Sequence, residues 1–380
     1  MNVQQSFLAP AVPKPADQTG TGADPRSVCV VIPMTTNPPW DLFDAIPVDI
    51  PIIVIDNSES GLAPPHGDRV LGENVYYFDE AAKRAYAGVH YAAMPHQNAA
   101  SRNIGHYIAW KEGFDVIMAL DYDCRTRPGW LTAHLDALRP VIRHPGIEPT
   151  TPNGWVNPIR QSFPNGDVVY PRGYPYELRT PELTGSTQVS TSGRVTLNLG
   201  VWDGIVDLNG IDTLYFGEPG DLGVIPGPSP AALGNIPVCG MNTAFVRELT
   251  PAYYFLPDLW INGWRLSRHD DIWGGYIVKR LMDRRGDLLT YGSPVVEHTK
   301  QTALNRVVVL EQWMHLMSMP FYELVDAAAA EVDPGDYTEM MAHFVDAYER
   351  QLSLSLAPTH YREVYRQLGT WLRAWSNAFI

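Results

Sequence analysis

The stretch "SRNIGHYIAWKEGFDVIMALDYD", residues 101–123, decides the fold. Over Asn98–Gly113, Ile104, Ile108 and the aromatic residues between them have the spacing of one helix face. Phe114–Cys124 follows as an apolar run typical of a strand buried on both faces, and this strand stops at two aspartates. A helix followed by such a strand predicts an α/β fold, with a mostly parallel sheet flanked by helices.

The sequence before this stretch predicts more of the same sheet. Strands are expected in three apolar runs, "SVCVVIP" (Ser27–Pro33), "PIIVIDN" (Pro51–Asn57) and "NVYYFDE" (Asn74–Glu80). A short helix is expected near Trp40–Ala45, and the alternation of strands and helices predicts right-handed crossovers. Ligands of such sheets bind beyond the carboxyl ends of the strands. Asp56 and the pair Asp121 and Asp123 lie at these ends.

The second half of the chain predicts a pocket wall and a helical end. From Pro145 to Pro237 the sequence is dense in Pro, Gly and Trp, which indicates loops and short strands that wall a pocket. His269–Gly286 has a helical pattern with Gly286 as C-cap. After Asn305 the pattern is helical to Ile380. We therefore expect a flexible tail over residues 1–26, a catalytic domain over 27–305 and a helical C-terminal extension over 306–380, packed on the domain or used for oligomerisation.

Composition narrows the class of protein. The chain has 380 residues with 28 basic against 42 acidic side chains, a net charge of −14. This balance disfavours nucleic-acid and anionic-membrane partners, because both need a basic face. No apolar run reaches the roughly 20 residues that span a bilayer, and residues 1–26 lack the order of a signal peptide. The three cysteines contain no CxxC pair, so we expect neither a disulfide framework nor a zinc site, and a cytoplasmic location.

The acidic pair Asp121 and Asp123 is the strongest chemical signal. Two carboxylates spaced i, i+2 at a strand end can both reach one hard cation, which in turn binds diphosphate oxygens. The alternative is an ordinary surface turn. However, a helix that starts at Arg102 and Asn103 is followed by a strand and then by the acidic pair. Over Val28–Trp130 the chain resembles GT-A type glycosyltransferases, which have these elements in the same order. This resemblance implies a GT-A type Rossmann-like sheet, in which Asp56 binds the base or ribose and Arg102 contributes to substrate binding.

Three more features suggest chemistry, and each has a plainer alternative. Asp270 and Asp271 in "RHDDIWGG" precede a helix. They either stabilise the N-terminus of this helix by their charge, or one of them orients sugar hydroxyls or acts as a base. His298 in "VVEHTK" is either a hydrogen-bonded structural histidine or a third metal ligand. Arg172 in "PRGYPYELR" is either a surface arginine or a fixed guanidinium that forks onto phosphate.

Over Val28–Trp313 the chain resembles a narrower group, the reversibly glycosylated polypeptides of plants, which are UDP-arabinopyranose mutases, and their bacterial relatives. The resemblance is carried by "LDYDC", "RGYPYELR", "LGVWDGIVDLNGID", "IPVCGMNTAFVREL", "RHDDIWGGYIVK" and "VVEHTK". It implies a bacterial member that interconverts pyranose and furanose forms of a UDP- or GDP-linked sugar with Mn²⁺ or Mg²⁺.

The resemblance also implies roles for single residues. Metal ligands would be Asp121, Asp123 and His298; catalytic residues Arg172, Asp270 and Asp271; and further substrate contacts Asn242 and Trp202. The family's motif has an acid where this chain has Tyr122. The family's sugar-accepting arginine is also absent at the aligned position, Phe163–Gly166. Arg160, a few residues upstream, could substitute only with a reshaped loop, which puts an arginyl-sugar intermediate in doubt.

In the expected mechanism, the bond between the anomeric carbon and the diphosphate breaks, the sugar ring opens and recloses, and the sugar recombines with the same diphosphate. Asp271 would shuttle or orient a hydroxyl proton. Two other functions stay open. One is an ordinary glycosyltransferase that passes the sugar to an acceptor. The other is a non-catalytic subunit that only binds a nucleotide-sugar. The partners expected are thus a nucleotide-sugar and possible further copies of this chain, with no nucleic acid and no membrane.

Overall fold

The fold is described from a computed structural model that covers most of the chain. It describes residues 11–12, 26–36, 46–58, 74–95, 99–141, 143–150, 154–159, 165–179, 186–217, 229–299 and 303–380. The predicted helix near Trp40–Ala45, Arg160 and almost all of the predicted N-terminal tail lie outside these residues.

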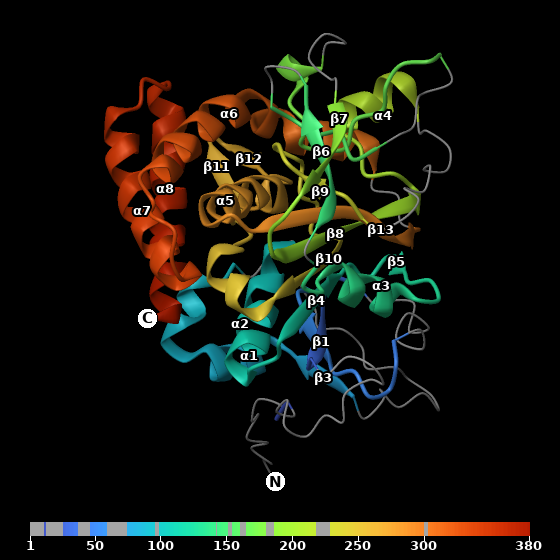
Figure 1. Ribbon diagram of the computed structural model, residues 1–380. Helices are drawn as coiled ribbons and strands as arrows, with labels where there is room; N and C mark the ends of the chain where they lie inside the picture. Colours follow the sequence, from blue (N-terminus) through green and yellow to red (C-terminus); the bar gives the residue numbers. More distant parts are fainter. Residues whose placement is uncertain are drawn as a thin grey trace.

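A sheet of eleven strands forms the centre of the molecule, in the order β3-β2-β1-β4-β10-β8-β13-β9-β6-β7, with β5 paired to β13 (Figure 1). Its strands are β1 (Val28–Met34), β2 (Ile52–Asp56), β3 (Val75–Phe78), β4 (Val116–Leu120), β5 (Cys124–Arg125), β6 (His144–Pro149), β7 (Ser186–Thr191), β8 (Val195–Gly204), β9 (Ala231–Ala232), β10 (Asn242–Val246) and β13 (Leu288–His298). A separate hairpin pairs β11 (Leu259–Ile261) with β12 (Trp264–Leu266).

The first four strands are parallel, as the sequence predicts. Successive residues of β1 point to opposite faces of the sheet, and both faces are covered. Cys29 and Val31 belong to one apolar core, and Val28 and Val30 belong to the other. This double burial explains why the strand reads as an unbroken apolar run. The other half of the sheet is mixed, with β10 antiparallel to both β4 and β8, and β8 parallel to β13.

Helices cover the sheet on both faces. They are α1 (Glu80–Ala87), α2 (Arg102–Glu112), α3 (Trp130–Ala137), α4 (Gly210–Phe216), α5 (Asp270–Arg285), α6 (Leu304–Ala330), α7 (Tyr337–Leu354) and α8 (Thr359–Ser376), with short 3₁₀ turns such as η3 (Gly88–Ala93) and η7 (Arg247–Ala252). Residues of α2 and α5 share the core that holds Val31, whereas Trp130 and Leu135 of α3 share the other core. The predicted α/β layering is therefore confirmed, as is the predicted C-cap of α5, where Gly286 has φ +82°.

The region predicted as loops and short strands contains more regular structure than expected. Its strand β8 is ten residues long, almost wholly buried, and central in the sheet. The polar residues Thr196 and Asn198 interrupt its apolar pattern, although both side chains are fully buried. Asn198 is held by the hydroxyl of Thr290, which donates to Asn198 Oδ1 at 2.8 Å. Buried polar groups that bond to one another hide a core strand from a hydropathy pattern.

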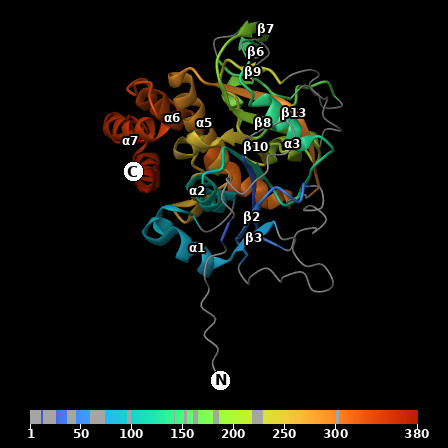
Figure 2. The ribbon, with the colours of Figure 1, turned by 60° about the horizontal axis from the view of Figure 1, so that its bottom comes forward.

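The C-terminal helices lie along one side of the molecule and pack on the sheet domain (Figures 1 and 2). The ring of Trp273 on α5 stacks on Phe321 of α6, with centroids 4.3 Å apart. Trp375 of α8 stacks on Tyr254, with centroids 4.9 Å apart. Of the two uses predicted for this extension, packing on the domain is therefore seen. Within the described ranges, none of the helices has the length and apolar character to cross a bilayer.

Candidate active site

A cavity of about 240 Å³ lies beside the carboxyl ends of β4 and β13, at the first turn of α5. It is lined by residues from widely separated parts of the chain. Seven of the predicted site residues line it, namely Arg102, Asp121, Asp123, Arg172, Asp270, Asp271 and His298. The expectation that acids at the strand ends meet at one edge of the sheet is therefore confirmed for Asp121 and Asp123.

Asp121 directly follows β4 and is fixed from two sides. Its backbone N–H donates to the carbonyl of Met241 at 3.0 Å, and its carboxylate forms an ion pair with Arg102. Burial and the charge of Asp123 raise the pKa of Asp121, against the opposing effect of Arg102. Tyr122, which stands in the middle of the motif, turns away to share a hydrogen bond of 2.9 Å with the hydroxyl of Thr35. Two acids thus remain on the cavity side.

His298 reaches this pair because β13 and β5 are neighbours. His298 is in register with Cys124, and the N–H of Thr299 donates to the carbonyl of Asp123 at 3.0 Å. On the imidazole, Nδ1 lies 2.6 Å from the carbonyl oxygen of Ile205, and Nε2 lies 3.8 Å from Asp123 Oδ2. Nδ1 therefore carries a proton toward Ile205 and Nε2 faces the acidic pair, the arrangement in which histidines bind metals. Burial alone would lower the pKa of His298, but its interaction with Asp123 outweighs burial and raises it.

These three side chains have the donors that a divalent cation takes. Asp123 Oδ1 is buried and has no hydrogen-bond partner among the described residues, so one carboxylate oxygen is left for a ligand. Oxygen donors with one imidazole suit Mn²⁺, and carboxylates suit Mg²⁺. The described residues contain no set of three His, Cys, Asp or Glu side chains already drawn together as a complete metal site. The fit therefore rests on donor type and on the free oxygen of Asp123.

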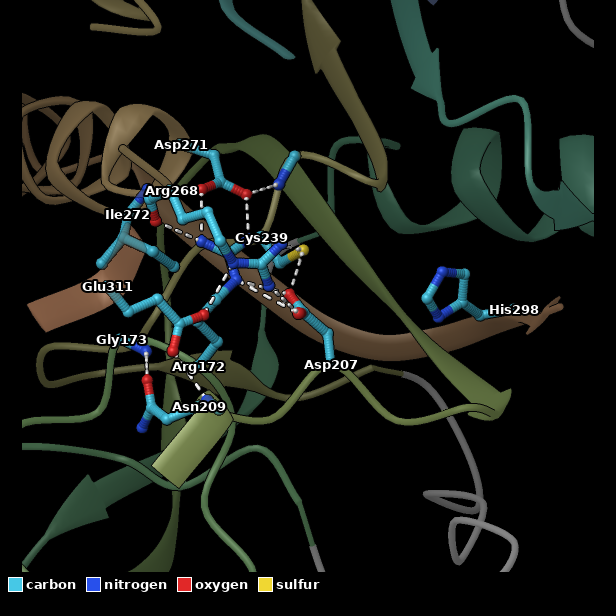
Figure 3. Close-up of polar contacts among 12 residues, drawn as sticks. Arg172, Gly173, Asp207, Asn209, Cys239, Arg268, Asp271, Ile272, His298 and Glu311 are labelled. Carbon is cyan, nitrogen blue, oxygen red and sulfur yellow. Dashed lines mark hydrogen bonds and ion pairs between the residues drawn. The ribbon is translucent and has the colours of Figure 1, made fainter. Parts of the chain in front are cut away.

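Arg172 occupies the centre of a buried ionic cluster on the opposite side of the cavity (Figure 3). Its Nε donates to Asp207 at 2.9 Å, and Nη1 and Nη2 donate to the two carboxylate oxygens of Asp271 at 2.9 and 2.8 Å. Nη1 also donates to the carbonyl of Arg268 at 2.7 Å, and Nη2 lies 3.9 Å from Cys239 Sγ. All five N–H groups are thus engaged. As placed, Arg172 has none left for a phosphate, and it fixes two carboxylates instead.

The two adjacent acids of α5 have different surroundings. Asp271 accepts from Arg172 and also from the backbone N–H of Gly240 at 3.1 Å and Ile272 at 2.9 Å. Burial alone would raise its pKa, but Arg172 and the N–H of Gly240 lower it to about 2. In Asp270, Oδ2 is buried without a partner among the described residues, and burial together with the charge of Asp271 raises the pKa to about 7. Two such carboxyl groups divide into one permanent anion and one that exchanges a proton near neutrality.

Three predicted substrate contacts lie away from this cavity. Asn242 of β10 is fully buried, and its side chain bonds to Trp130, His134 and the carbonyls of Val201 and Pro294. Trp202 of β8 is buried in the core that holds α3. Asp56 ends β2 as predicted, where its Oδ1 accepts from the backbone and the hydroxyl of Ser58 at 2.8 and 2.7 Å. A direct substrate contact stays a prediction for all three.

Sequence reasoning missed four side chains of the cluster around Arg172. They are Asp207, Cys239, Arg268 and Glu311. The first three stand inside segments that already carried the family resemblance. Glu311 stands on the buried face of α6 between Val307 and Met314. A lone acid on an apolar helix face needs a partner, and this spacing is the signal that could have revealed it.

The charge of the cavity wall is negative. Five aspartates line it, Asp121, Asp123, Asp207, Asp270 and Asp271, against three arginines, Arg102, Arg172 and Arg268. Each arginine is already paired with at least one acid. A polyanionic ligand would be repelled here unless a cation enters with it.

The chain was compared with protein families and with single known proteins. A family model described as "Reversibly glycosylated polypeptide" matches residues 52–379. The chain is 24% identical over 290 residues to "Probable UDP-arabinopyranose mutase 2" of Solanum tuberosum, covering 74% of this chain and 72% of that protein. It is 25% identical over 290 residues to "UDP-arabinopyranose mutase 3" of Arabidopsis thaliana, with the same coverage of 74% and 72%.

Among solved structures, the chain resembles glucosyl-3-phosphoglycerate synthase from Mycobacterium tuberculosis, crystallised with Mn²⁺, UDP and phosphoglyceric acid. The sequence identity is 13%, the TM-score is 0.38, and the likeness covers 79% of this chain and 78% of that one. A further structure of that synthase, crystallised with Mg²⁺ and UDP, has 13% identity and a TM-score of 0.37, and covers 77% of this chain and 79% of that one.

Proposed function

The chain belongs to the reversibly glycosylated polypeptide family, and on this basis we propose that it is a nucleotide-sugar mutase that interconverts the pyranose and furanose forms of a UDP-linked sugar. UDP is preferred over GDP because the two plant relatives carry names of UDP-arabinopyranose mutases. A bacterial origin, a cytoplasmic location and assembly into homo-oligomers stay predictions.

One observation carries the proposal. A strand-end pair of acids and a histidine share a cavity with a second, adjacent pair of acids whose two carboxyl groups have opposite protonation preferences. The first set suits the diphosphate end of a nucleotide-sugar, through a cation. The second set suits a sugar whose hydroxyl groups must lose and regain a proton as the ring opens and closes.

We assign the cation to Asp121, Asp123 and His298. When bound, Mn²⁺ or Mg²⁺ would supply charge neutralisation for the diphosphate as it leaves the anomeric carbon. Arg102 would keep Asp121 pointed at the cavity through their ion pair. Asp56, at the end of β2, would bind the base or ribose, and Asn242 and Trp202 would support the wall from the core behind it.

On the sugar side the roles of the two adjacent acids differ. Asp271 has both oxygens occupied by Arg172 and backbone N–H groups, so it orients Arg172 and stays charged. Asp270 has an unpartnered oxygen and a pKa near 7, so we assign it the proton transfer. This reverses the expectation from sequence, which gave the proton to Asp271. Arg172 holds Asp207 and Asp271 in place and keeps a positive charge in the wall.

The test is incubation of the purified protein with UDP-arabinopyranose and Mn²⁺, without any acceptor, followed by proton NMR of the products. We expect the furanose form of the same nucleotide-sugar and no free UDP. Release of UDP that depends on an added acceptor would instead identify a glycosyltransferase. Binding of the nucleotide-sugar with no change in its ring form would identify a non-catalytic subunit.

A further inference from the structure

Glu311 is the one charged side chain among the buried residues of α6. It has no solvent exposure, although a buried carboxylate is costly unless it is paired and hydrogen-bonded. Its neighbours on the same face, Val307 and Met314, are apolar. An apolar residue would fit this face as well, so the acid requires another explanation, which its partners provide.

Both carboxylate oxygens of Glu311 hold parts of the cavity wall. Oε1 accepts from Arg268 Nε at 2.7 Å, and Oε2 accepts from the backbone N–H of Gly210 at 2.7 Å. His315 Nε2 lies 3.6 Å from Oε2. Arg268 and Gly210 both line the cavity, and they belong to the loop before α5 and to the start of α4. Glu311 therefore ties two separate segments of the wall to α6.

Arg268 transmits this tie to the centre of the site. Its Nη2 donates to Asp207 at 3.2 Å, and its carbonyl accepts from Arg172 at 2.7 Å. Its backbone has φ +59°, a left-handed conformation that residues with a side chain seldom adopt. Such a conformation persists only where the surroundings fix it, and here the fixed carbonyl is the one that Arg172 uses. Charges alternate from Glu311 through Arg268, Asp207 and Arg172 to Asp271 (Figure 3).

We propose that Glu311 is a positioning residue of the active site, acting through Arg268 to hold Asp207, Arg172 and Asp271 where the sugar is bound. The C-terminal helices thereby belong to the site, since α6 also contributes Leu304 and Val307 to its wall. That this cavity binds the sugar rests on the proposed function. The positioning role of Glu311 rests on its ionic contacts alone.

The direct test is Glu311→Gln, which keeps the size and the acceptor for Gly210 but removes the charge that faces Arg268. The matched control is Glu323→Gln, the same change on the same helix at an exposed position. With UDP-arabinopyranose and Mn²⁺, we expect kcat to fall about tenfold to hundredfold in Glu311→Gln, with KM and UDP affinity within twofold of the wild type. Glu323→Gln should match the wild type.

A double-mutant cycle and a spectrum keep the test decisive. If Glu311 acts through Arg268, the combined Glu311→Gln and Arg268→Gln protein loses no more kcat than the worse single variant. In proton–nitrogen spectra, the Nε–H signal of Arg172 should shift in Glu311→Gln and not in Glu323→Gln. This signal can be measured even if the wild type converts no nucleotide-sugar. That outcome would contradict the proposed function but not the positioning role of Glu311. Unchanged kcat, additive losses or an unmoved Arg172 signal would overturn the proposal.

Discussion

Asp270 and Asp271 are adjacent in the chain, yet only Asp271 lies against a guanidinium and two backbone donors. The difference arises because α5 starts at Asp270, so successive side chains in its first turn point in different directions. Asp270 is left with an unpartnered oxygen. A pair of acids that sequence alone treats as equivalent is thus divided into two roles by packing.

A pH profile separates the two roles. With a pKa of about 7, Asp270 is protonated below that pH and becomes the carboxylate above it. Wild-type kcat should therefore rise from about pH 6 to about pH 8, because removal of a hydroxyl proton needs the carboxylate. Asp270→Asn should be slow and lose this rise. Asp271→Asn should be slow through displacement of Arg172 and should keep a rise, but at lower pH, because the charge of Asp271 helps to raise the pKa of Asp270. A rise that survives in Asp270→Asn would contradict the assignment.

Gly173, the residue after Arg172, lies where an added side chain would meet α5. Its φ is +87°, and a Cβ there would lie 2.5 Å from Ile272 Cγ2 on α5. Gly173→Ala should lower the free energy of unfolding in urea by about 1–3 kcal/mol and reduce kcat. Gly166→Ala is the control, because Gly166 has a similar φ of +91° but no atom of the described residues lies within 4 Å of the added carbon. Equal losses in both variants would show that the contact with Ile272 is unimportant.

At the scale of elements, the N-terminal half of the sheet could be predicted from sequence and much of the site's wall could not. Strands β1, β2 and β4 are unbroken apolar runs, and their ends carry Asp56 and Asp121, so pattern alone locates them. Strand β8 contains buried polar residues whose partners are far away in sequence, so no local pattern reveals it. Likewise Glu311 belongs to the site only because α6 packs beside α4 and α5.

The pairing of β13 with β5 predicts a role for His298 in cation binding. His298→Ala should weaken Mn²⁺ binding at least about tenfold. Mutation of a residue that only hydrogen-bonds to a metal ligand already lowers metal affinity by about this factor. Calorimetric titration with Mn²⁺ measures this. His343→Ala, at an exposed position of α7, serves as the control. Mn²⁺ affinity that is the same in all three proteins would remove His298 from the predicted metal ligands.

At the scale of the whole molecule, the C-terminal helices and the sheet domain share one core. Aromatic contacts join them, as between Tyr276 of α5 and Tyr322 of α6, whose ring centroids are 4.1 Å apart. From this shared core we propose that the predicted domain over 27–305 and the predicted extension over 306–380 fold together rather than as independent units.

Removal of residues 304–380 tests this unity. The truncated chain would expose Trp273 and Tyr254, which are now fully buried, so we expect an aggregated or molten protein without nucleotide binding. The full chain should unfold in one thermal transition. A truncated chain that is soluble, folded by near-UV circular dichroism and able to bind UDP would contradict a shared core.

The molecule as a whole carries a net charge of −14, and the cavity wall has more acids than arginines. We therefore propose that an anionic nucleotide binds only together with a cation held by Asp121, Asp123 and His298. Calorimetric titration of UDP into wild-type and Asp123→Asn protein, with Mn²⁺ and after chelation, tests this most directly. We predict that Mn²⁺ strengthens UDP binding at least about tenfold in the wild type and has little effect in Asp123→Asn. Equal UDP affinity in all four titrations would contradict the account.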